Sequence, residues 1–215
     1  MGRAIINHAA ESELCPRIRV KRFKIETKSK KPATLEWIQA FMKHSTPHLG
    51  GLALFMFLTG ARVSEALAVE WGDVDLKAKS VLIRQTKLGN ERRAHLPLPL
   101  IVALANIPRS NSSRGVFWYT NRSNAYRVWD TAIRRAKIER LSFHSCRHGF
   151  ATALLQAGVD PVTVAKLGGW KTTRHVFETY GHAIDDSTIT DRISGTDLTQ
   201  RMHVDSRKPH KMGTT

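Results

Sequence analysis

The chain has 215 residues, which suits one domain of about 150 to 200 residues with additional terminal segments. Its hydrophobic fraction of 41% is enough for a core. No apolar run reaches the roughly 18 residues of a membrane span, and the N-terminus lacks the apolar stretch of a signal peptide. Lys and Arg total 34 against 18 acidic residues, so the formal net charge is +16. This excess favours a polyanionic partner, most simply nucleic acid, over a merely basic soluble protein.

Residues 1–31 are predicted to form a basic arm or linker. From Arg17 to Lys31 there are eight basic residues and a single acid, Glu26. Such a segment can cross DNA phosphates, and a disordered, solvated tail is the open alternative. Two widely separated cysteines, Cys15 and Cys146, favour a reduced, cytoplasmic protein.

Three helices are predicted next, over residues 32–45, 47–60 and part of 61–71. Thr34 is the expected N-cap of the first. The second is apolar almost throughout, so it should be buried, and Gly60 should end it. The third is short and contains Glu65.

Residues 73–97 change to short β-type runs separated by two turns. This pattern predicts a three-stranded antiparallel sheet, whose second turn contains Gly89 and Asn90, with Lys87 just before it. A helix over 97–106 and a polar loop over 108–121 follow. Ser123 or Asn124 should then cap a helix with one apolar and one basic side, the latter carrying Arg127, Arg134, Arg135 and Lys137.

The stretch from Ser142 to His182 organises the chain. Its first helix has an apolar side, and His144 and Arg147 lie together on the neighbouring stripe, at the edge of the core. An imidazole and a guanidinium placed together in this way suit a phosphate. Asp160 should cap a short helix that Gly168 and Gly169 interrupt, and a final helix should reach Tyr180. Residues 184–215 are polar, and partial disorder is expected there.

These residues indicate phosphoryl transfer without a metal. His144, Cys146 and His148 cluster, but no carboxylate accompanies them and Cys146 belongs to the core side. No glycine-rich phosphate loop is present. Arginines can neutralise phosphate oxygens, and a tyrosine hydroxyl can act as a covalent nucleophile. The residues alone therefore suggest a DNA-acting phosphotransferase.

The chain also resembles the catalytic domain of the tyrosine recombinases, or phage integrases, over roughly residues 32–183. Four blocks match in the family's order: Thr59–Glu65 (TGARVSE), Thr86–Asn90 (TKLGN), His144–His148 (HSCRH), and Leu167–Trp170 (LGGW) followed by Tyr180–His182 (YGH). Each block alone is a weak signal, whereas the ordered set is strong.

The resemblance implies a mainly α fold with a small three-stranded antiparallel sheet (α+β), no metal and no cofactor. It implies that Tyr180 attacks the scissile phosphate, that Arg62 and Arg147 hold its non-bridging oxygens, and that Lys87 protonates the leaving oxygen. His144 would serve acid–base exchange, and Trp170 would hydrogen-bond the phosphate. Glu65 and His182 would be supporting residues. Double-stranded DNA would be the partner, with self-association on DNA and no membrane.

Each assignment has a simpler alternative. Arg62 could only cap a helix with Glu65, and Lys87 could be a solvated lysine, with Lys77, Lys79 and Arg92 as nearby candidates for its role. His144, Trp170 and Tyr180 could be packing residues.

The chain departs from the family in one respect, because only the basic arm stands where members usually carry an N-terminal DNA-clamping domain of about 100 residues. Either the gene is truncated or the chain is a short form. Three functions therefore compete: an active site-specific recombinase or integrase, a DNA-binding remnant or regulator without strand exchange, and a type IB topoisomerase-like enzyme.

Overall fold

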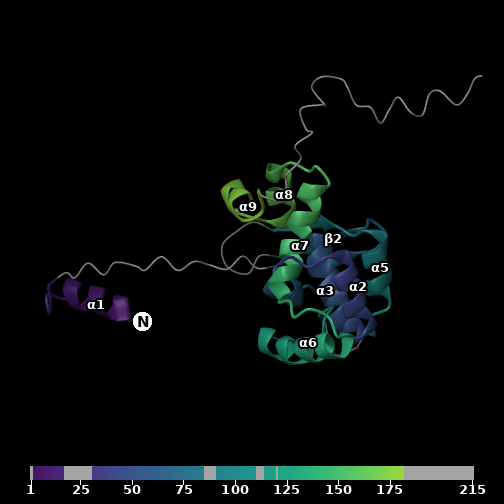
Figure 1. The fold of residues 1–215 in the computed structure, drawn as a ribbon, viewed down its shortest axis with the longest axis horizontal. Coiled ribbons are helices and arrows are strands. Elements are labelled where there is room, and N and C mark those ends of the chain that lie inside the picture. The colour runs from purple at the N-terminus through teal and green to yellow at the C-terminus, as the bar shows by residue number, and fades with distance from the viewer. Residues whose placement is uncertain (1, 17–30, 85–90, 110–113, 120, 182–215) are drawn as a thin grey trace, which may run out of the picture.

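The computed structural model describes residues 2–16, 31–84, 91–109, 114–119 and 121–181. Its main body is helical with one small sheet, as the sequence predicts (Figure 1). The elements, in chain order, are α1 (Gly2–Glu11), α2 (Leu35–Lys43), α3 (Pro47–Thr59), α4 (Val63–Leu67), the 3₁₀ helix η1 (Trp71–Asp73), β1 (Val74–Asp75), β2 (Ser80–Ile83), β3 (Arg92–His95), α5 (Leu98–Ala105), α6 (Arg122–Ala136), α7 (Phe143–Gln156), α8 (Pro161–Gly168) and α9 (Thr173–Tyr180).

Helix α3 lies at the centre of the core, which explains its lack of a polar face. Eleven of its thirteen residues are buried, and it packs against α7, α2 and α5. Thr46 caps its N-terminus through a side-chain bond to the N–H of Leu49, and Gly60 ends it with a left-handed φ of 66°. The position at which α3 ends therefore depends on local residues, and it places the next turn beside α7.

The sheet has the order β1-β2-β3 and is antiparallel throughout, as the turn pattern predicts. Val81 of β2 pairs with Ala94 of β3, and both side chains are buried. Because strand residues alternate between faces, Arg92 lies on the same face of β3 as Ala94. That register directs the Arg92 side chain toward the helical body.

Two details of the helices differ from the sequence prediction. Helix α6 begins at Arg122 and is capped by Asn121, whose side chain accepts a bond from the N–H of Asn124, so Ser123 and Asn124 are not its caps. Several capping residues compete in this stretch, and the first of them prevails. Helix α1 was not predicted, because the composition of residues 1–31 pointed to an arm.

Helix α7 approaches the chain before α2 so closely that only glycine fits at position 149. A Cβ on Gly149 would lie 2.2 Å from the carbonyl oxygen of Ala33 and 2.8 Å from Cε2 of Phe57. The N–H of Ala33 donates to the carbonyl of Ser145 at 2.8 Å, which fixes this approach. Helix α7, with its candidate site residues, is therefore held in place by a backbone contact.

Gly149→Ala is expected to lower the free energy of unfolding by about 1–3 kcal/mol, because the added methyl group overpacks this contact. Urea denaturation of the purified chain measures the effect. Gly72→Ala is the matched control, because a Cβ at Gly72 meets nothing within 4 Å. Equal stability of the two variants would contradict the close approach of α7 to Ala33.

A second, smaller core joins α8 and α9 to the C-terminal half of α7. It consists of buried residues from these three helices: Ala151, Leu155, Val164, Ala165, Val176 and Tyr180. In Figure 1, α8 and α9 lie together at one end of the body, beyond α7. We call residues 161–180, which contain these two helices and the turn with Trp170 between them, the α8–α9 unit. Within the described ranges, no helix is long and apolar enough to cross a membrane.

Candidate active site

Arg62 stands at the turn between α3 and α4. A Cβ at Gly60 would lie 2.6 Å from Cδ1 of Phe150, so the turn requires glycine both for space and for its positive φ. Arg62 is the N-cap residue of α4, and its backbone N–H donates to Oε2 of Glu65 at 3.0 Å. Its Nη1 donates to Oε1 of the same carboxylate at 2.6 Å. Arg62 therefore has both the capping contact and a side chain that stays 40% exposed, next to a Glu65 that is 3% exposed.

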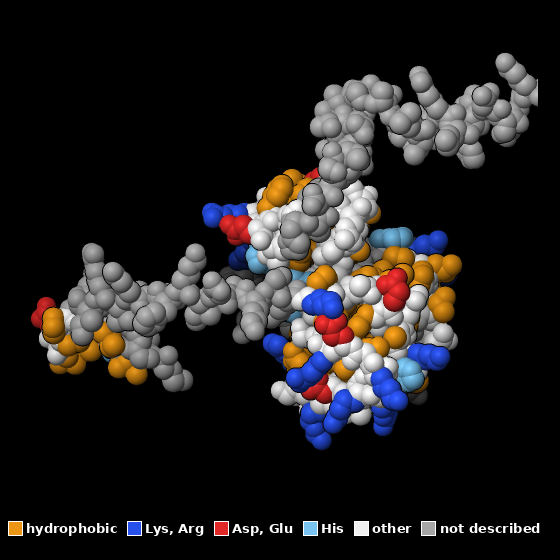
Figure 2. All heavy atoms as spheres, in the orientation of Figure 1, with side chains coloured by type: hydrophobic (Ala, Val, Ile, Leu, Met, Phe, Trp, Pro, Cys, Tyr) orange, Lys and Arg blue, Asp and Glu red, His pale blue; other side chains and the backbone are white. Residues whose placement is uncertain are grey.

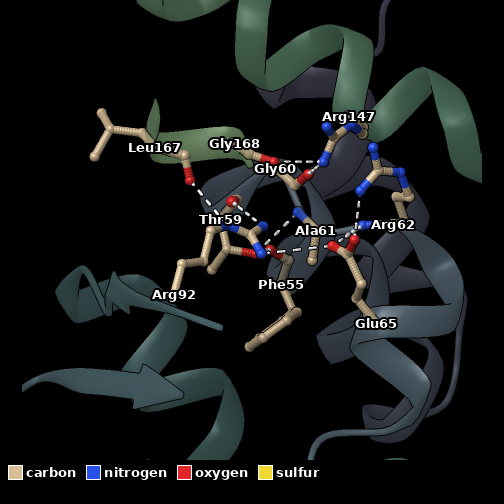
Figure 3. Close-up of polar contacts among 10 residues, drawn as sticks. All are labelled: Phe55, Thr59, Gly60, Ala61, Arg62, Glu65, Arg92, Arg147, Leu167 and Gly168. Atoms are coloured by element: carbon tan, nitrogen blue, oxygen red, sulfur yellow. Dashed lines mark hydrogen bonds and ion pairs between the residues drawn. The ribbon is translucent and has the colours of Figure 1, made fainter. Parts of the chain in front are cut away.

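Arg147 is buried rather than at the edge of the core, which corrects the sequence prediction. Its side chain is 3% exposed. Nη1 donates to the carbonyl oxygens of Gly60 and, at 2.7 Å, of Gly168 (Figure 3). The C-terminal ends of α3 and α8 thus cover this guanidinium. The helical periodicity of α7 does not reveal this arrangement.

The other amino group of Arg147 is the least satisfied polar atom of this region. Nη2 is buried and has no hydrogen-bond partner within the part of the chain that the structure describes. The guanidinium lies 3.7 Å from the centroid of the Trp170 ring, a cation–π contact. A buried cationic donor without an acceptor is costly, which makes this position suited to an anionic ligand.

Positive charge exceeds negative charge around Arg147. Burial lowers the pKa of Arg147, and the nearby charges of Arg62 and Arg92 lower this pKa further, while Glu65 opposes them. Glu65 is the carboxylate that contacts both Arg62 and, at 3.5 Å, Arg92. Three guanidinium groups around one carboxylate leave a local excess of about two charges, which an anion would compensate.

Tyr180 is the last residue of α9 and is 4% exposed. Burial raises the pKa of its hydroxyl to about 12, although the charge of Arg147 acts in the opposite direction. The hydroxyl is therefore protonated at neutral pH, and any use of it as a nucleophile requires a group that takes its proton. The Trp170 ring lies 6.1 Å from that of Tyr180, measured between centroids.

Two histidines of α7 lead toward Tyr180. His144 is exposed in the first turn, and its ring centroid lies 5.6 Å from that of His148. The His148 ring in turn lies 5.3 Å from that of Tyr180. His148 has no counterpart among the predicted site residues, although its spacing of four residues from His144 places both on one stripe of the helix.

Arg92 is the second residue whose place in the site the sequence analysis missed. Its Nε donates to the carbonyl of Leu167 at 3.0 Å and its Nη2 to that of Thr59 at 3.3 Å, and the side chain is 12% exposed (Figure 3). Strand alternation with Ala94 was the available signal. Lys77 and Lys79, in contrast, are exposed in the turn between β1 and β2.

Two of the expected site residues, Lys87 and His182, lie outside the described residues. Within those that are described, no three His, Cys, Asp or Glu side chains are grouped to hold a metal ion. Cys146 is fully buried, and burial raises the pKa of its thiol.

Comparison with known proteins identifies the family. The model of the phage integrase family matches residues 31–186. The tyrosine recombinase XerD of Mycobacterium tuberculosis is 33% identical over 129 residues, which cover 53% of this chain and 41% of XerD. The integrase of Salmonella phage P22 is 25% identical over 170 residues, covering 69% of this chain and 44% of the phage protein. The chain thus spans less than half the length of these curated relatives.

Solved structures show the same fold. The catalytic domain of bacteriophage HP1 integrase aligns with a TM-score of 0.60 and 22% identity, over 79% of this chain and 97% of that domain. A lambda integrase dimer bound to a COC' core site aligns with a TM-score of 0.63 and 15% identity, over 80% of this chain and 71% of that one. The fold is that of the tyrosine recombinase catalytic domains. From the family match over most of its length, this chain belongs to the phage integrase family, the tyrosine recombinases.

Proposed function

We propose that this chain is the catalytic part of a site-specific DNA recombinase, which cleaves and rejoins DNA through a covalent 3′-phosphotyrosine intermediate. Residues 32–183 would form the catalytic domain. The observation that carries the proposal is Arg147, whose Nη2 is buried without an acceptor in the described structure, in a site of three arginines close to Tyr180. A phosphodiester supplies the missing acceptor and the missing negative charge.

The arginines act on the non-bridging oxygens. Arg147 presents Nη2 to one oxygen, and the exposed side of the Arg62 guanidinium contacts the other, while Glu65 keeps Arg62 in place. The guanidinium groups are held before the phosphate arrives, so they stabilise the charge of the transition state with little reorganisation. The ring of Trp170 packs against the guanidinium of Arg147 in a cation–π contact. The indole N–H of Trp170 can donate to the phosphate.

The nucleophile is the hydroxyl of Tyr180. Its oxygen forms a bond to phosphorus, and the bond between phosphorus and the 5′ oxygen breaks, so that the electron pair leaves on that oxygen. The high pKa of Tyr180 means that a base must take its proton during the attack. We assign this exchange to His144, and His148, whose ring centroid lies 5.3 Å from that of Tyr180, is the second candidate.

Lys87 gives a proton to the 5′ oxygen as it leaves. The resulting phosphotyrosine retains the energy of the phosphodiester, so the reverse reaction rejoins DNA without a cofactor. His182 would support the same phosphate. Both assignments rest on the family's motif, because the two residues lie outside the described part of the chain.

Double-stranded DNA is the proposed partner, and two matched sites would bring copies of the chain together. Figure 2 shows Lys and Arg side chains gathered on the part of the surface where α6 lies. The arginines of α6 are exposed: Arg122, Arg127, Arg134 and Arg135, with Lys137 following the helix. This face and the basic arm give two surfaces for DNA phosphates.

The test of the proposed function begins with a library of nicked duplexes of random sequence. A recombinase or a type IB topoisomerase-like enzyme forms a denaturant-resistant adduct with some of these duplexes, whereas a DNA-binding remnant forms none. Dependence of strand exchange on two matched sites then separates the recombinase from the topoisomerase-like enzyme. Failure to recover any adduct from the library would contradict the proposal.

Affinity for non-specific duplex DNA is expected to fall steeply with salt, because the net charge is +16. Each phosphate contact contributes a slope of about −0.9 to log K against log salt. Deleting residues 1–31 should make this slope shallower by several units, since it removes the eight basic residues of 17–31. The control deletes only residues 1–16, which keeps all eight. If both deletions give the slope of the full chain, the arm does not contact DNA.

A further inference from the structure

Two arginines bridge the same pair of helix ends. Arg92 donates to the carbonyls of Thr59 and Leu167. Arg147 donates to the carbonyls of the two residues that follow these, Gly60 and Gly168 (Figure 3). Thr59 and Gly60 end α3, and Leu167 and Gly168 end α8. The last carbonyls of a helix lack partners within the helix and lie at the negative end of its dipole. Cations at this position therefore satisfy both ends together.

The backbones of these two helix ends lie in direct contact. A Cβ on Gly60 would lie 3.2 Å from Cα of Gly168. Gly169 has a φ of 68°, and a Cβ there would lie 3.2 Å from Nε of Arg92. The glycines at the ends of α3 and α8 thus allow Arg92 to approach both helix ends closely.

The two arginines differ in what remains available to a ligand. Arg147 keeps Nη2 without a partner in the described structure. Arg92 uses Nε for Leu167 and Nη2 for Thr59, and its Nη1 lies 3.5 Å from Oε2 of Glu65. All three of its nitrogens are thus directed at the protein, so Arg92 is suited neither to hold the phosphate nor to give up a proton in place of Lys87.

We propose that Arg92 is a positioning residue, which holds the α8–α9 unit, with Trp170 and Tyr180, against the turn that carries Arg62. The small core joins the α8–α9 unit to α7, and Arg92 adds a second attachment, which runs from β3 to the carbonyl of Leu167. Arg92 is the first residue of β3, so it connects the unit to the sheet. Its effect on catalysis rests on the function proposed above.

The first test reads the position of Trp170 without DNA. The protein contains five tryptophans, and labelling with 5-fluorotryptophan gives one ¹⁹F resonance for each, with Trp170 assigned from Trp170→Phe. In Arg92→Gln we expect the Trp170 resonance to shift or broaden, while the resonances of Trp37 and Trp129 in the main core stay unchanged. Arg93→Gln is the matched control, because Arg93 is the next residue on β3 and is exposed. It should leave all five resonances in place.

The second test measures the rate of adduct formation on a duplex recovered from the library. Arg92→Gln should slow the reaction about a hundredfold, the effect of misplacing a reacting group by roughly 1 Å. Its affinity for the duplex should equal that of Arg93→Gln, since each variant loses one charge. Arg92→Lys should stay as slow as Arg92→Gln. The planar guanidinium of Arg92 contacts the carbonyls of Leu167 and Thr59 and the carboxylate of Glu65, and one ammonium group cannot reach all three.

Three results would overturn the proposal: an unchanged Trp170 resonance in Arg92→Gln, loss of all five resonances together, or a wild-type rate in Arg92→Lys. The second would mean that Arg92 stabilises the whole fold, and the third that only its charge matters. If the wild-type chain forms no adduct, the proposed function fails, whereas the Trp170 resonance still decides whether Arg92 positions the α8–α9 unit.

Discussion

Tyr180→Phe is expected to abolish covalent attachment to DNA, lowering adduct formation by more than about a thousandfold. The substitution removes the attacking oxygen but no positive charge, so affinity for DNA should stay nearly unchanged. The ring is 4% exposed within the core of the α8–α9 unit, and phenylalanine keeps its shape there. Denaturing electrophoresis of end-labelled DNA measures the adduct, and a binding titration measures the affinity.

Tyr126→Phe is the matched control for this prediction. Tyr126 is a half-buried residue of α6 that packs edge-on against Phe143, with 4.6 Å between the ring centroids. Its variant should form the adduct at the wild-type rate. A denaturant-resistant adduct in Tyr180→Phe would show that another residue is the nucleophile.

The second large effect separates the arginine from the lysine. Arg147→Ala should lower cleavage about a hundredfold to a thousandfold, because charge on the non-bridging oxygens is then uncompensated. Lys87→Ala should also cleave slowly, because no acid then protonates the 5′ leaving oxygen. When sulfur replaces the bridging 5′ oxygen, the leaving group no longer needs a proton. Lys87→Ala should then recover to within about tenfold of the wild-type rate, whereas Arg147→Ala should remain slow.

Lys79→Ala serves as the control. Lys79 is exposed in the turn between β1 and β2, so its substitution should leave the cleavage rate of either substrate unchanged. Arg147→Lys accompanies Arg147→Ala, since it keeps a cation in the buried position that the carbonyls of Gly60 and Gly168 surround. Rescue of the arginine variant by sulfur, without rescue of the lysine variant, would show that the role of Lys87 is wrongly assigned.

Local patterns predicted most of the elements. The apolar run of α3, the left-handed glycine at its end and the first turn of the small sheet are all encoded over a few residues, and all are found. The predicted second turn, with Gly89 and Asn90, lies outside the described residues. The predicted N-cap of α6 was wrong, because neighbouring capping residues compete. Helix α1 was missed, because the basic residues of 17–31 decided the interpretation of the whole segment 1–31.

Long-range contacts account for what the sequence could not show. Periodicity placed Arg147 at the edge of the core, but the ends of α3 and α8 bury it, and these are 87 and 21 residues away. Arg92 was considered only as a proton donor, since a strand pattern does not show which helix ends its face meets. Motif order, in contrast, identified Arg62, Arg147, Trp170 and Tyr180, which the structure brings together around Arg147.

Mapping the covalent adduct identifies the nucleophile directly. The wild-type chain is trapped on a nicked duplex labelled on either side of the cleaved bond, then digested with protease, and the DNA-linked peptide is sequenced by mass spectrometry. We expect a single peptide containing Tyr180, joined through phosphate to the 3′ end of the cleaved strand. A peptide lacking Tyr180, or linkage to the 5′ end, would contradict it.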